Sequence, residues 1–224
     1  MRQAKRWVMG FGVVAMVACA GWARGGDPLP LFDGKGLDGW ECFLTKPDVK
    51  LTDVWSVEDG LLVCKGEPLG YLYTKASFTS FRLIVEWRWA PGTKPGNSGV
   101  LLRITGEHAF LPKCIEAQLQ NGSAGDIWAF GGATCQGNPA RTRTVTGHKQ
   151  LGNFGGVAKI KANEKAPGEW NRYEITLDGD QLSLIVNGEQ VNVASGIAVV
   201  PGQIGLQSEG GQIQFRTVEL TPLP

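Results

Sequence analysis

The chain has 224 residues, with 22 basic and 21 acidic side chains and only 2 histidines. This near-neutral balance gives no electrostatic basis for binding nucleic acid or an anionic membrane, and neither histidine belongs to a cluster with metal-ligand spacing. The sequence therefore predicts no metal, no cofactor and no nucleic-acid partner.

The N-terminus has the pattern of an export signal. Three basic residues precede an apolar run, 7–18, which is followed by small residues. The run is shorter than the ~20 residues that a transmembrane helix needs. We predict a signal peptide over residues 1–23, a mature domain over 24–224 and a periplasmic or extracellular location, with lipid anchoring at Cys19 as an alternative. No later segment resembles a transmembrane helix, so we expect none in the mature chain.

After the signal, strand-length runs alternate with turn residues. In chain order they are VWSVEDG (54–60), LLVCKG (61–66), YLYTKASF (71–78), FRLIVEWRWA (81–90), GVLLRI (99–104), CIEAQLQ (114–120), GVAKIKA (156–162), NRYEITLDGD (171–180), LSLIVNGEQ (182–190), GQIGLQS (202–208) and IQFRTVEL (213–220). No segment after residue 24 has sustained helical spacing of apolar residues. The pattern predicts one all-β domain, a sandwich of two antiparallel sheets or a jelly roll.

Turn and loop signals separate these runs. Asp59-Gly60, Asp178-Gly179 and Asn187-Gly188 are dipeptides typical of tight hairpin turns. Residues 131–156 form the one long section without a strand pattern, and long loops in compact domains are often functional.

Four cysteines follow the predicted signal, namely Cys42, Cys64, Cys114 and Cys135. An even number in an oxidising compartment permits two disulfides. The most local pairing joins Cys42 to Cys64 and Cys114 to Cys135. Buried free thiols are the alternative.

Alternation within the strands separates a core face from a polar face. In 81–90 the core side is Phe81, Leu83, Val85, Trp87 and Trp89, and in 114–120 it is Ile115, Ala117 and Leu119. The opposite side of these strands and of 97–103 carries Glu86, Arg88, Asn97, Arg103, Glu116, Gln118 and Gln120. If the three strands are neighbours, Glu86, Arg88, Arg103, Glu116 and Gln118 form one polar patch. Such a patch is either a solvated face or the floor of a ligand site.

Further candidates lie elsewhere in the chain. Asp126 and Trp128 follow in a Gly-rich loop, and His148 lies in the long section 131–156. Gln207 and Glu209 are two residues apart and so point the same way from one strand. Tryptophan rings stack on the C–H faces of sugars, although most tryptophans in a β-protein belong to the core.

Six motifs in order resemble one known family. They are LFDGKGLDGW (31–40), NSGVLLR (97–103), EAQ (116–118), PGEWN (167–171), VNGE (186–189) and GQIGLQSEGGQIQFR (202–216). Together they are similar to the 3-keto-disaccharide hydrolase domain family, formerly a domain of unknown function, over residues 29–222. The resemblance implies a concanavalin A-like jelly-roll sandwich and an exported glycan-processing enzyme that acts on sugars oxidised at C3.

The resemblance also implies positions for a sugar site, at Asn97, Arg103, Glu116, Gln118, Gln207 and Arg216. A C3 ketone acidifies the proton on C2, so a base can remove it while the glycosidic oxygen leaves from C1. Our hypothesis gives Glu116 the role of base and Arg103 that of enolate stabiliser. Asp126 or Glu209 would be the acid. The residues left to bind substrate would be Asn97, Gln118, Gln120, Trp128, Glu86, Arg88, Gln207 and His148.

Two alternatives stay open on the sequence alone. Direct hydrolysis by two carboxylates would use Glu116 with Glu86 or with Asp126. A non-catalytic, lectin-like carbohydrate-binding module would need the amides and an aromatic ring but no carboxylate poised for proton transfer. Both alternatives keep a carbohydrate as the partner.

Overall fold

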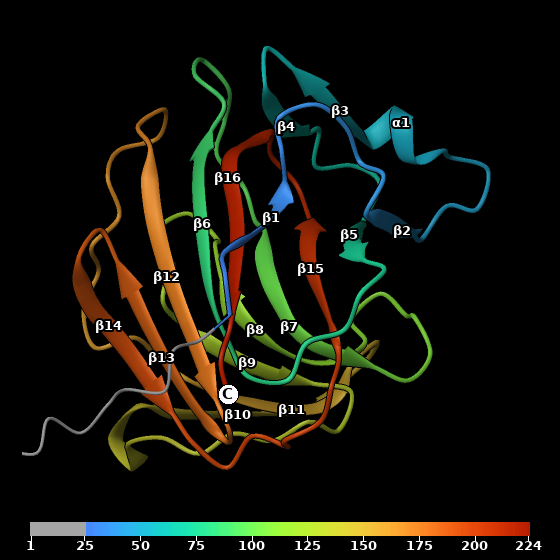
Figure 1. Cartoon of the computed structure of the whole chain (residues 1–224). Helices are drawn as coiled ribbons and strands as arrows, with labels where there is room; N and C mark the ends of the chain where they lie inside the picture. The colour runs from blue at the N-terminus through green and yellow to red at the C-terminus, as the bar shows by residue number, and fades with distance from the viewer. Residues whose placement is uncertain (1–25) are drawn as a thin grey trace, which may run out of the picture.

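The computed structural model describes residues 26–224 and consists of two antiparallel sheets packed face to face (Figure 1). This confirms the predicted all-β sandwich. The predicted signal peptide and Cys19 lie outside the described residues. No helix within residues 26–224 is long and apolar enough to cross a membrane.

Sheet A contains eight strands. In spatial order they are β14 (Glu189–Ala194), β13 (Gln181–Val186), β12 (Asn171–Asp178), β6 (Phe81–Trp89), β16 (Ile213–Pro222), β4 (Leu61–Cys64) and β3 (Trp55–Glu58), with β1 (Leu29–Phe32) also paired to β16. The long central strands β6 and β16 hold the sheet together, because β16 pairs with β6 along almost its whole length.

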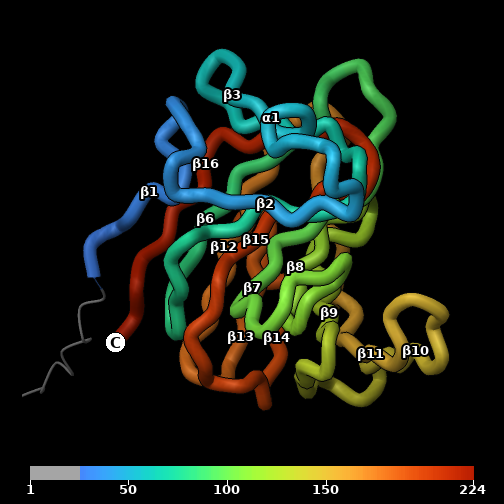
Figure 2. Tube along the Cα trace, turned by 90° about the vertical axis from the view of Figure 1, so that its right-hand side faces the viewer, coloured from blue at the N-terminus to red at the C-terminus, as the bar shows by residue number. Residues whose placement is uncertain are grey.

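Sheet B also contains eight strands and carries the features that matter for function. In spatial order they are β10 (Thr142–His148), β11 (Gly152–Val157), β9 (Ile127–Phe130), β8 (Lys113–Gln118), β7 (Gly99–Thr105), β15 (Gln203–Ser208), β5 (Gly70–Thr74) and β2 (Trp40–Leu44). Figure 2 shows this order from β2, near the top, to the β10–β11 hairpin at the lower right. The only helices of the described residues are α1 (Leu51–Val54) and the 3₁₀ turn η1 (Pro139–Arg141).

The core lies between the two sheets and follows the predicted alternation. All five expected core residues of β6, from Phe81 to Trp89, are buried, whereas Arg82 on the other face is exposed. On β8, Ile115 and Ala117 join the same core from sheet B. The period of two in the sequence therefore identifies the inner face of each sheet correctly.

Two of the predicted turns have the backbone conformation that their residues favour. Asp59 and Gly60 have φ angles of 50° and 77°, and Asn187 and Gly188 have 49° and 82°. Two successive positive φ values define a type I′ hairpin turn, which Asp-Gly and Asn-Gly adopt with little strain. The Asp178-Gly179 turn differs, since Asp178 still belongs to β12.

The section 131–156 is more regular than its sequence suggests. Most of it forms the hairpin of β10 and β11, which extends sheet B through the pairing of β11 with β9. The expected strand 156–162 ends at Val157, so the prediction was wrong beyond that residue. Three of the six residues of β11 are glycines, and because they have no side chains the strand shows no apolar alternation in the sequence.

All four described cysteines are free thiols, so the two local disulfides do not form. Cys114 belongs to a cluster on the outer face of sheet B, whereas Cys135 packs against the core between the sheets. Cys42 is on β2 of sheet B and Cys64 on β4 of sheet A. The thiols act as small apolar groups at these positions.

Candidate functional site

Sheet B has a second set of packed side chains on its outer face, which points away from sheet A. Leu101 and Cys114 belong to this outer cluster with Tyr71, Tyr73 and Phe130. The neighbouring residues of the same strands, such as Leu102 and Ile115, point into the core instead. Because polar candidate residues share the outer face with this cluster, we expect a functional site on the outer face.

One row of directly paired residues crosses this face from edge to edge. Its members are Glu41, Tyr73, Gly205, Leu101, Glu116, Trp128, Gly156 and Arg143, on β2, β5, β15, β7, β8, β9, β11 and β10. Neighbouring strands lie about 4.8 Å apart, so side chains in this row are next to one another. Glu116 therefore sits beside Trp128, in the middle of the face.

Around Glu116 lies a group that we call the carboxylate–amide cluster, consisting of Asn97, Glu116, Gln118, Gln207 and Glu209. Glu116 and Gln207 are each only 2% exposed, yet one side-chain oxygen of each has no hydrogen-bond partner in the described residues. The side-chain oxygen of Asn97 is buried and unpartnered as well. Three buried side-chain oxygens without a partner in one place are costly, and a ligand, an ordered solvent molecule or a proton on Glu116 would satisfy them.

Gln118 is fixed so that its amide nitrogen faces Glu116. Its Oε1 accepts hydrogen bonds from the backbone N–H groups of Leu119 and Gln120, at 2.9 and 2.8 Å. Its Nε2 lies 3.5 Å from Oε2 of Glu116. The Gln118 side chain is thus a prepositioned donor on the floor of the cluster.

Gly99 makes room for the two buried acceptors. A Cβ atom at this position would lie 2.1 Å from Oε1 of Glu116 and 2.4 Å from Oε1 of Gln207. Glu116 on β8 and Gln207 on β15 therefore approach each other across β7, above the bare backbone of Gly99. Because Gly99 has no side chain, residues of β8 and β15, which are not neighbouring strands, can belong to one site.

Gly99→Ala is expected to lower kcat/KM about 10–10²-fold, because the added methyl group must displace both Glu116 and Gln207 from their positions. The assay uses a 3-keto sugar, the substrate class that the sequence motifs imply, and far-UV circular dichroism checks the fold. Gly36→Ala is the matched control, since a Cβ there meets no atom within 4 Å. Wild-type kcat/KM in Gly99→Ala would contradict the assignment of this site.

Both carboxyl groups of the cluster hold their protons more tightly than usual. Burial raises the pKa of Glu116 well above its ordinary value, and the charges of Glu209 and Asp126 raise it further. Burial also raises the pKa of Glu209 to about 7, although a hydrogen bond from Asn97 opposes the shift. Glu116 therefore holds its proton to higher pH than an exposed glutamate does, while Glu209 is partly ionised near pH 7.

Glu209 is reached from solvent through a recess at the end of β15. A cavity of about 350 Å³ is lined by Glu209 and Gly210 together with Thr45, Lys46, Glu67, Pro68 and Leu69. The backbone N–H of Asn97 donates to the carbonyl oxygen of Gly210 at 2.9 Å, and this bond places Asn97 beside Glu209. Glu209 is thus the carboxyl group of the cluster that lines a recess open to a ligand.

Asp126 lies close to the cluster but is already paired. It is 3% exposed, accepts a hydrogen bond from the backbone N–H of Lys159 at 2.8 Å, and forms an ion pair with Arg143 at 3.1 Å. The Arg143 guanidinium also lies over the Trp128 ring, 5.9 Å from its centroid. The pair of Asp126 and Arg143 thus braces Trp128, and both carboxylate oxygens of Asp126 already have partners within the protein.

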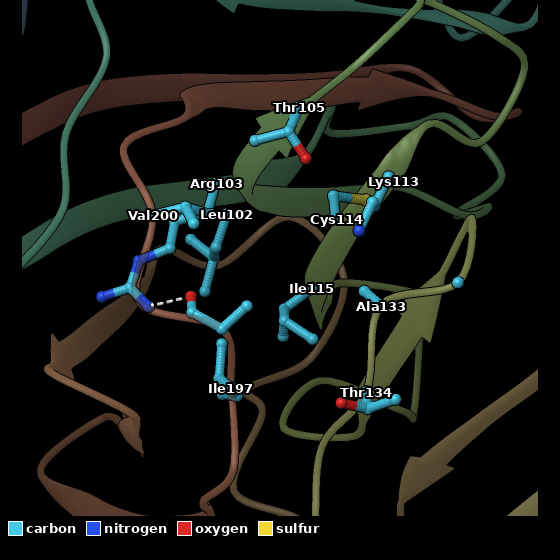
Figure 3. A pocket seen from close by; sticks show the side chains of 12 residues that line it. Leu102, Arg103, Thr105, Lys113, Cys114, Ile115, Ala133, Thr134, Ile197 and Val200 are labelled. Atoms are coloured by element: carbon cyan, nitrogen blue, oxygen red, sulfur yellow. Dashed lines mark hydrogen bonds between the residues drawn. The ribbon is translucent and has the colours of Figure 1, made fainter.

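Arg103 lies apart from the carboxylate–amide cluster, which corrects the expected enolate-stabilising role. Its φ angle of 51° coincides with a register shift in β7, so its side chain does not follow the alternation of Gly99 and Leu101. The guanidinium instead donates to the backbone carbonyl oxygens of Thr79, Gly179 and Ala198. Figure 3 shows Arg103 in the cavity between β7, β8 and the loop that carries Ile197 and Val200, with its bond to Ala198 as the dashed line.

Arg103→Ala is expected to lower the free energy of unfolding by about 2–4 kcal/mol, because the buried guanidinium that joins the carbonyl oxygens of Thr79, Gly179 and Ala198 is lost. Urea denaturation measures this loss, with Arg88→Ala as a partly exposed arginine control that we expect to cost less than about 1 kcal/mol. Unchanged stability together with lost turnover would restore Arg103 to the active site.

Glu86 and Arg88 lie on β6 of sheet A, so the expected five-residue patch does not exist. Glu86 accepts hydrogen bonds from Arg216 and Thr217, and Arg88 bonds to Gln214 on β16. Strand β6 belongs to sheet A and β8 to sheet B. The alternation within a single strand does not indicate to which sheet the strand belongs. These residues form a charged surface on sheet A, whereas Glu116 lies on sheet B.

The two remaining candidates lie at the margin of the face. Gln120 is exposed and follows the end of β8. His148 is exposed at the tip of the β10–β11 hairpin, where its Nδ1 accepts from the backbone N–H of Leu151 at 3.2 Å. Its ring contacts the edge of Phe154, with centroids 5.9 Å apart, and Phe154 in turn contacts Trp128.

Sequence reasoning missed several polar and aromatic residues of this face, namely Glu41, Phe43, Tyr71, Tyr73, His108 and Arg143. Tyr73 donates to Glu41 at 3.0 Å, and the Tyr71 hydroxyl lies 2.8 Å from Nδ1 of His108. Tyr71 and Tyr73 are two residues apart within one predicted strand, and this spacing was the available signal. His108 gave no signal, since it follows β7 in a loop.

The fold and the outer face together define a concanavalin A-like sandwich in which one sheet carries two carboxyl groups with raised pKa values. The chain belongs to the family of 3-keto-alpha-glucoside-1,2-lyase-like domains, whose model matches residues 27–221. This match confirms the family resemblance of the sequence motifs. A comparison with curated proteins gave no match.

Solved structures with the same fold include enzymes and binding modules. One proposed glycosyl hydrolase from Parabacteroides distasonis has a TM-score of 0.62 at 23% identity, over 88% of this chain and 100% of that one. A second from the same organism has a TM-score of 0.62 at 18% identity, over 88% and 94%. The carbohydrate-binding module CBM66 from Bacillus subtilis has a TM-score of 0.57 at 14% identity, over 81% and 94%. At these identities the likeness concerns the fold.

Proposed function

We propose that this protein is an exported enzyme that cleaves 3-keto-glycosides by β-elimination at the carboxylate–amide cluster. The observation that carries the proposal is the pair of Glu116 and Glu209, two carboxyl groups with raised pKa values beside unpartnered acceptors. Pairs of titratable groups with different protonation states near neutral pH are typical of acid–base catalysis. Membership in a family of 3-keto-glucoside lyase-like domains supports the choice of substrate.

The protonation states assign the two roles in the opposite sense to our sequence hypothesis. Glu209 is partly ionised near neutral pH, so its carboxylate removes the proton from C2 and the C3 oxygen becomes an enolate. The C1–O bond then breaks, and its electron pair goes to the leaving oxygen, which takes the proton of Glu116. The products are a 1,2-unsaturated 3-keto sugar and the released alcohol, and a later proton exchange with water resets both carboxyl groups.

The amides of the cluster serve the developing charge. Nε2 of Gln118 points into the cluster because the oxygen of that amide is held by backbone N–H groups. It can therefore donate to the enolate oxygen without reorganisation, in the role that Arg103 cannot fill. The unpartnered side-chain oxygens of Asn97 and Gln207 accept from sugar hydroxyl groups.

The proposal is tested by incubating the purified protein with 3-keto-trehalose and with trehalose, followed by chromatography and mass spectrometry. We expect cleavage of the keto sugar alone, with a first product lighter by one water molecule than the hydrolysis product. In D₂O, recovered hydrated product should carry deuterium at C2. Hydrolysis without deuterium at C2 would contradict elimination, and cleavage of trehalose itself would contradict the need for the ketone.

A non-catalytic carbohydrate-binding module is the second candidate, favoured by the shared fold with CBM66 and by the aromatic and amide side chains of the same face. Calorimetric titration with 3-keto-trehalose separates the two functions. Saturable binding without any product after prolonged incubation would support the binding module and would contradict the enzyme.

A further inference from the structure

On the β2–β5 side of the carboxylate–amide cluster lies a group of rings that we call the aromatic platform, made of Phe43, Tyr71, Tyr73 and His108. The rings of Phe43 and His108 are partly exposed and nearly parallel, with centroids 6.4 Å apart and an angle of 22°. Both tyrosines are buried and support them. Tyr71 lies 5.6 Å from Phe43, and Tyr73 stacks on His108 at 4.1 Å.

The hydrogen bonds of the platform determine which nitrogen of His108 carries the proton. Burial raises the pKa of Tyr71 and lowers the pKa of His108, so both groups are neutral near pH 7. The Tyr71 oxygen accepts from the backbone N–H of Ala109, and Tyr71 is fully buried, so we infer that its own proton is donated to Nδ1 of His108, 2.8 Å away, because this tautomer leaves no buried hydroxyl proton without an acceptor. The remaining proton of the imidazole is on Nε2, which has no partner in the described part of the chain.

The platform is adjacent to the reacting groups. Tyr71 on β5 is the direct cross-strand partner of Gln207 on β15, and Gln207 shares the hollow above Gly99 with Glu116. From β5 to β8 there are three strand spacings, about 14 Å in all. Two linked sugar rings can cover this span, one at the carboxyl groups and the other on the platform.

We propose that the aromatic platform is the subsite for the leaving sugar, and that His108 positions it. The partly exposed ring of Phe43 offers a flat surface to the C–H groups of a pyranose, and Nε2–H of His108 donates to one of its hydroxyl groups. Glu41 accepts from Tyr73 through one oxygen and keeps the other for a second hydroxyl. The assignment of the ring as a leaving group rests on the proposed function. It makes the substrate class a keto-disaccharide, rather than a keto-glycoside with a small alkyl group.

The test compares two substrates, 3-keto-trehalose and methyl 3-keto-α-glucoside, in wild type, His108→Ala, His108→Phe and Phe43→Ala. For the disaccharide we expect His108→Ala and Phe43→Ala to raise KM about 10-fold with little change in kcat, since one hydrogen bond or one stacking surface is lost. His108→Phe keeps the ring and should lie between wild type and His108→Ala. The methyl glycoside should be unaffected throughout. Glu107→Ala, an exposed neighbour in the same loop, is the matched control.

Equal losses for both substrates would overturn the subsite, as would unchanged KM for the disaccharide in all three variants. If His108→Ala does not fold, His108→Phe and Phe43→Ala carry the same comparison. A binding experiment keeps this inference separate from the proposed function. If the wild type cleaves neither substrate, calorimetry with trehalose and methyl α-glucoside still decides. Tighter binding of trehalose that is lost in Phe43→Ala supports the platform, and equal affinity for both sugars contradicts it.

Discussion

Glu116→Gln is expected to lower the turnover of 3-keto-trehalose by about 10²–10⁴-fold, the usual worth of a positioned general acid. The amide has nearly the shape of the carboxyl group, so the hollow above Gly99 stays filled and only the transferable proton is lost. Steady-state kinetics with the keto sugar measures the change. Because substrate binding still uses Gln118 and the platform, the loss should fall on kcat more than on KM.

The same variant should not be destabilised, which separates a catalytic role from a structural one. A carboxyl group whose pKa is raised in the folded state contributes its full stabilisation below the pKa that it has in the unfolded chain. This contribution is lost as pH rises through the folded pKa. The free energy of unfolding of the wild type therefore falls as pH rises above about 4.5, because the unfolded chain gives up protons that the folded protein still holds. For Glu209 this loss ends near its folded pKa of about 7, and Glu116 adds a loss of the same sign. Gln cannot ionise, so Glu116→Gln should be more stable than wild type at pH 8 and equal to it at pH 4. Lower stability at pH 8 would contradict the raised pKa of Glu116.

The layout of the fold follows from the sequence because its physical signals are local. Alternation identifies the buried side of β6 and β8, and Asp-Gly and Asn-Gly identify hairpin turns by their tolerance of positive φ. Strands without apolar alternation cannot be predicted from such local signals. The glycine-rich β11 is held by its pairing with β9 rather than by side chains of its own.

The site is predicted only as far as residues on one strand determine it. Glu116 and Gln118 share a face because they are two apart, and the structure keeps them together. The prediction fails where the position of a side chain depends on the neighbouring strand or on a backbone irregularity. Glu86 lies on the other sheet, and one residue of positive φ turns Arg103 out of the row. Neither the layer to which a strand belongs nor a bulge is encoded in the alternation of a single strand.

His108 and Arg143 show the complementary limit. Each reaches the outer face from a segment with no recognisable pattern, His108 from the loop after β7 and Arg143 from the hairpin. Their side chains are held by contacts with residues distant in the sequence, with Tyr71 in one case and with Asp126 in the other. Loops placed by a rigid sheet often carry function, and here His108 adds a ring at the β2–β5 side of the face, while Arg143 on β10 ends the row that runs through Glu116.

Glu209→Gln is expected to lower kcat/KM for 3-keto-trehalose by about 10²–10⁴-fold, because an amide cannot remove the C2 proton. The wild-type pH profile provides the more specific test. With a base of pKa about 7, kcat/KM should rise through neutral pH as Glu209 ionises, and it should fall at higher pH as Glu116 loses the proton that the leaving oxygen needs. A bell-shaped profile with its lower limb near pH 7 is therefore the expected result.

Asn97→Ala assigns that lower limb to one residue. The Asn97 amide holds the pKa of Glu209 down through a hydrogen bond to its carboxylate, so its removal should raise this pKa and move the lower limb to higher pH. The upper limb, which belongs to Glu116, should move much less. Asn121→Ala is the control, since Asn121 is an exposed amide just beyond β8 whose side chain makes no hydrogen bond to the cluster. A lower limb that stays in place in Asn97→Ala would show that a group other than Glu209 accepts the C2 proton.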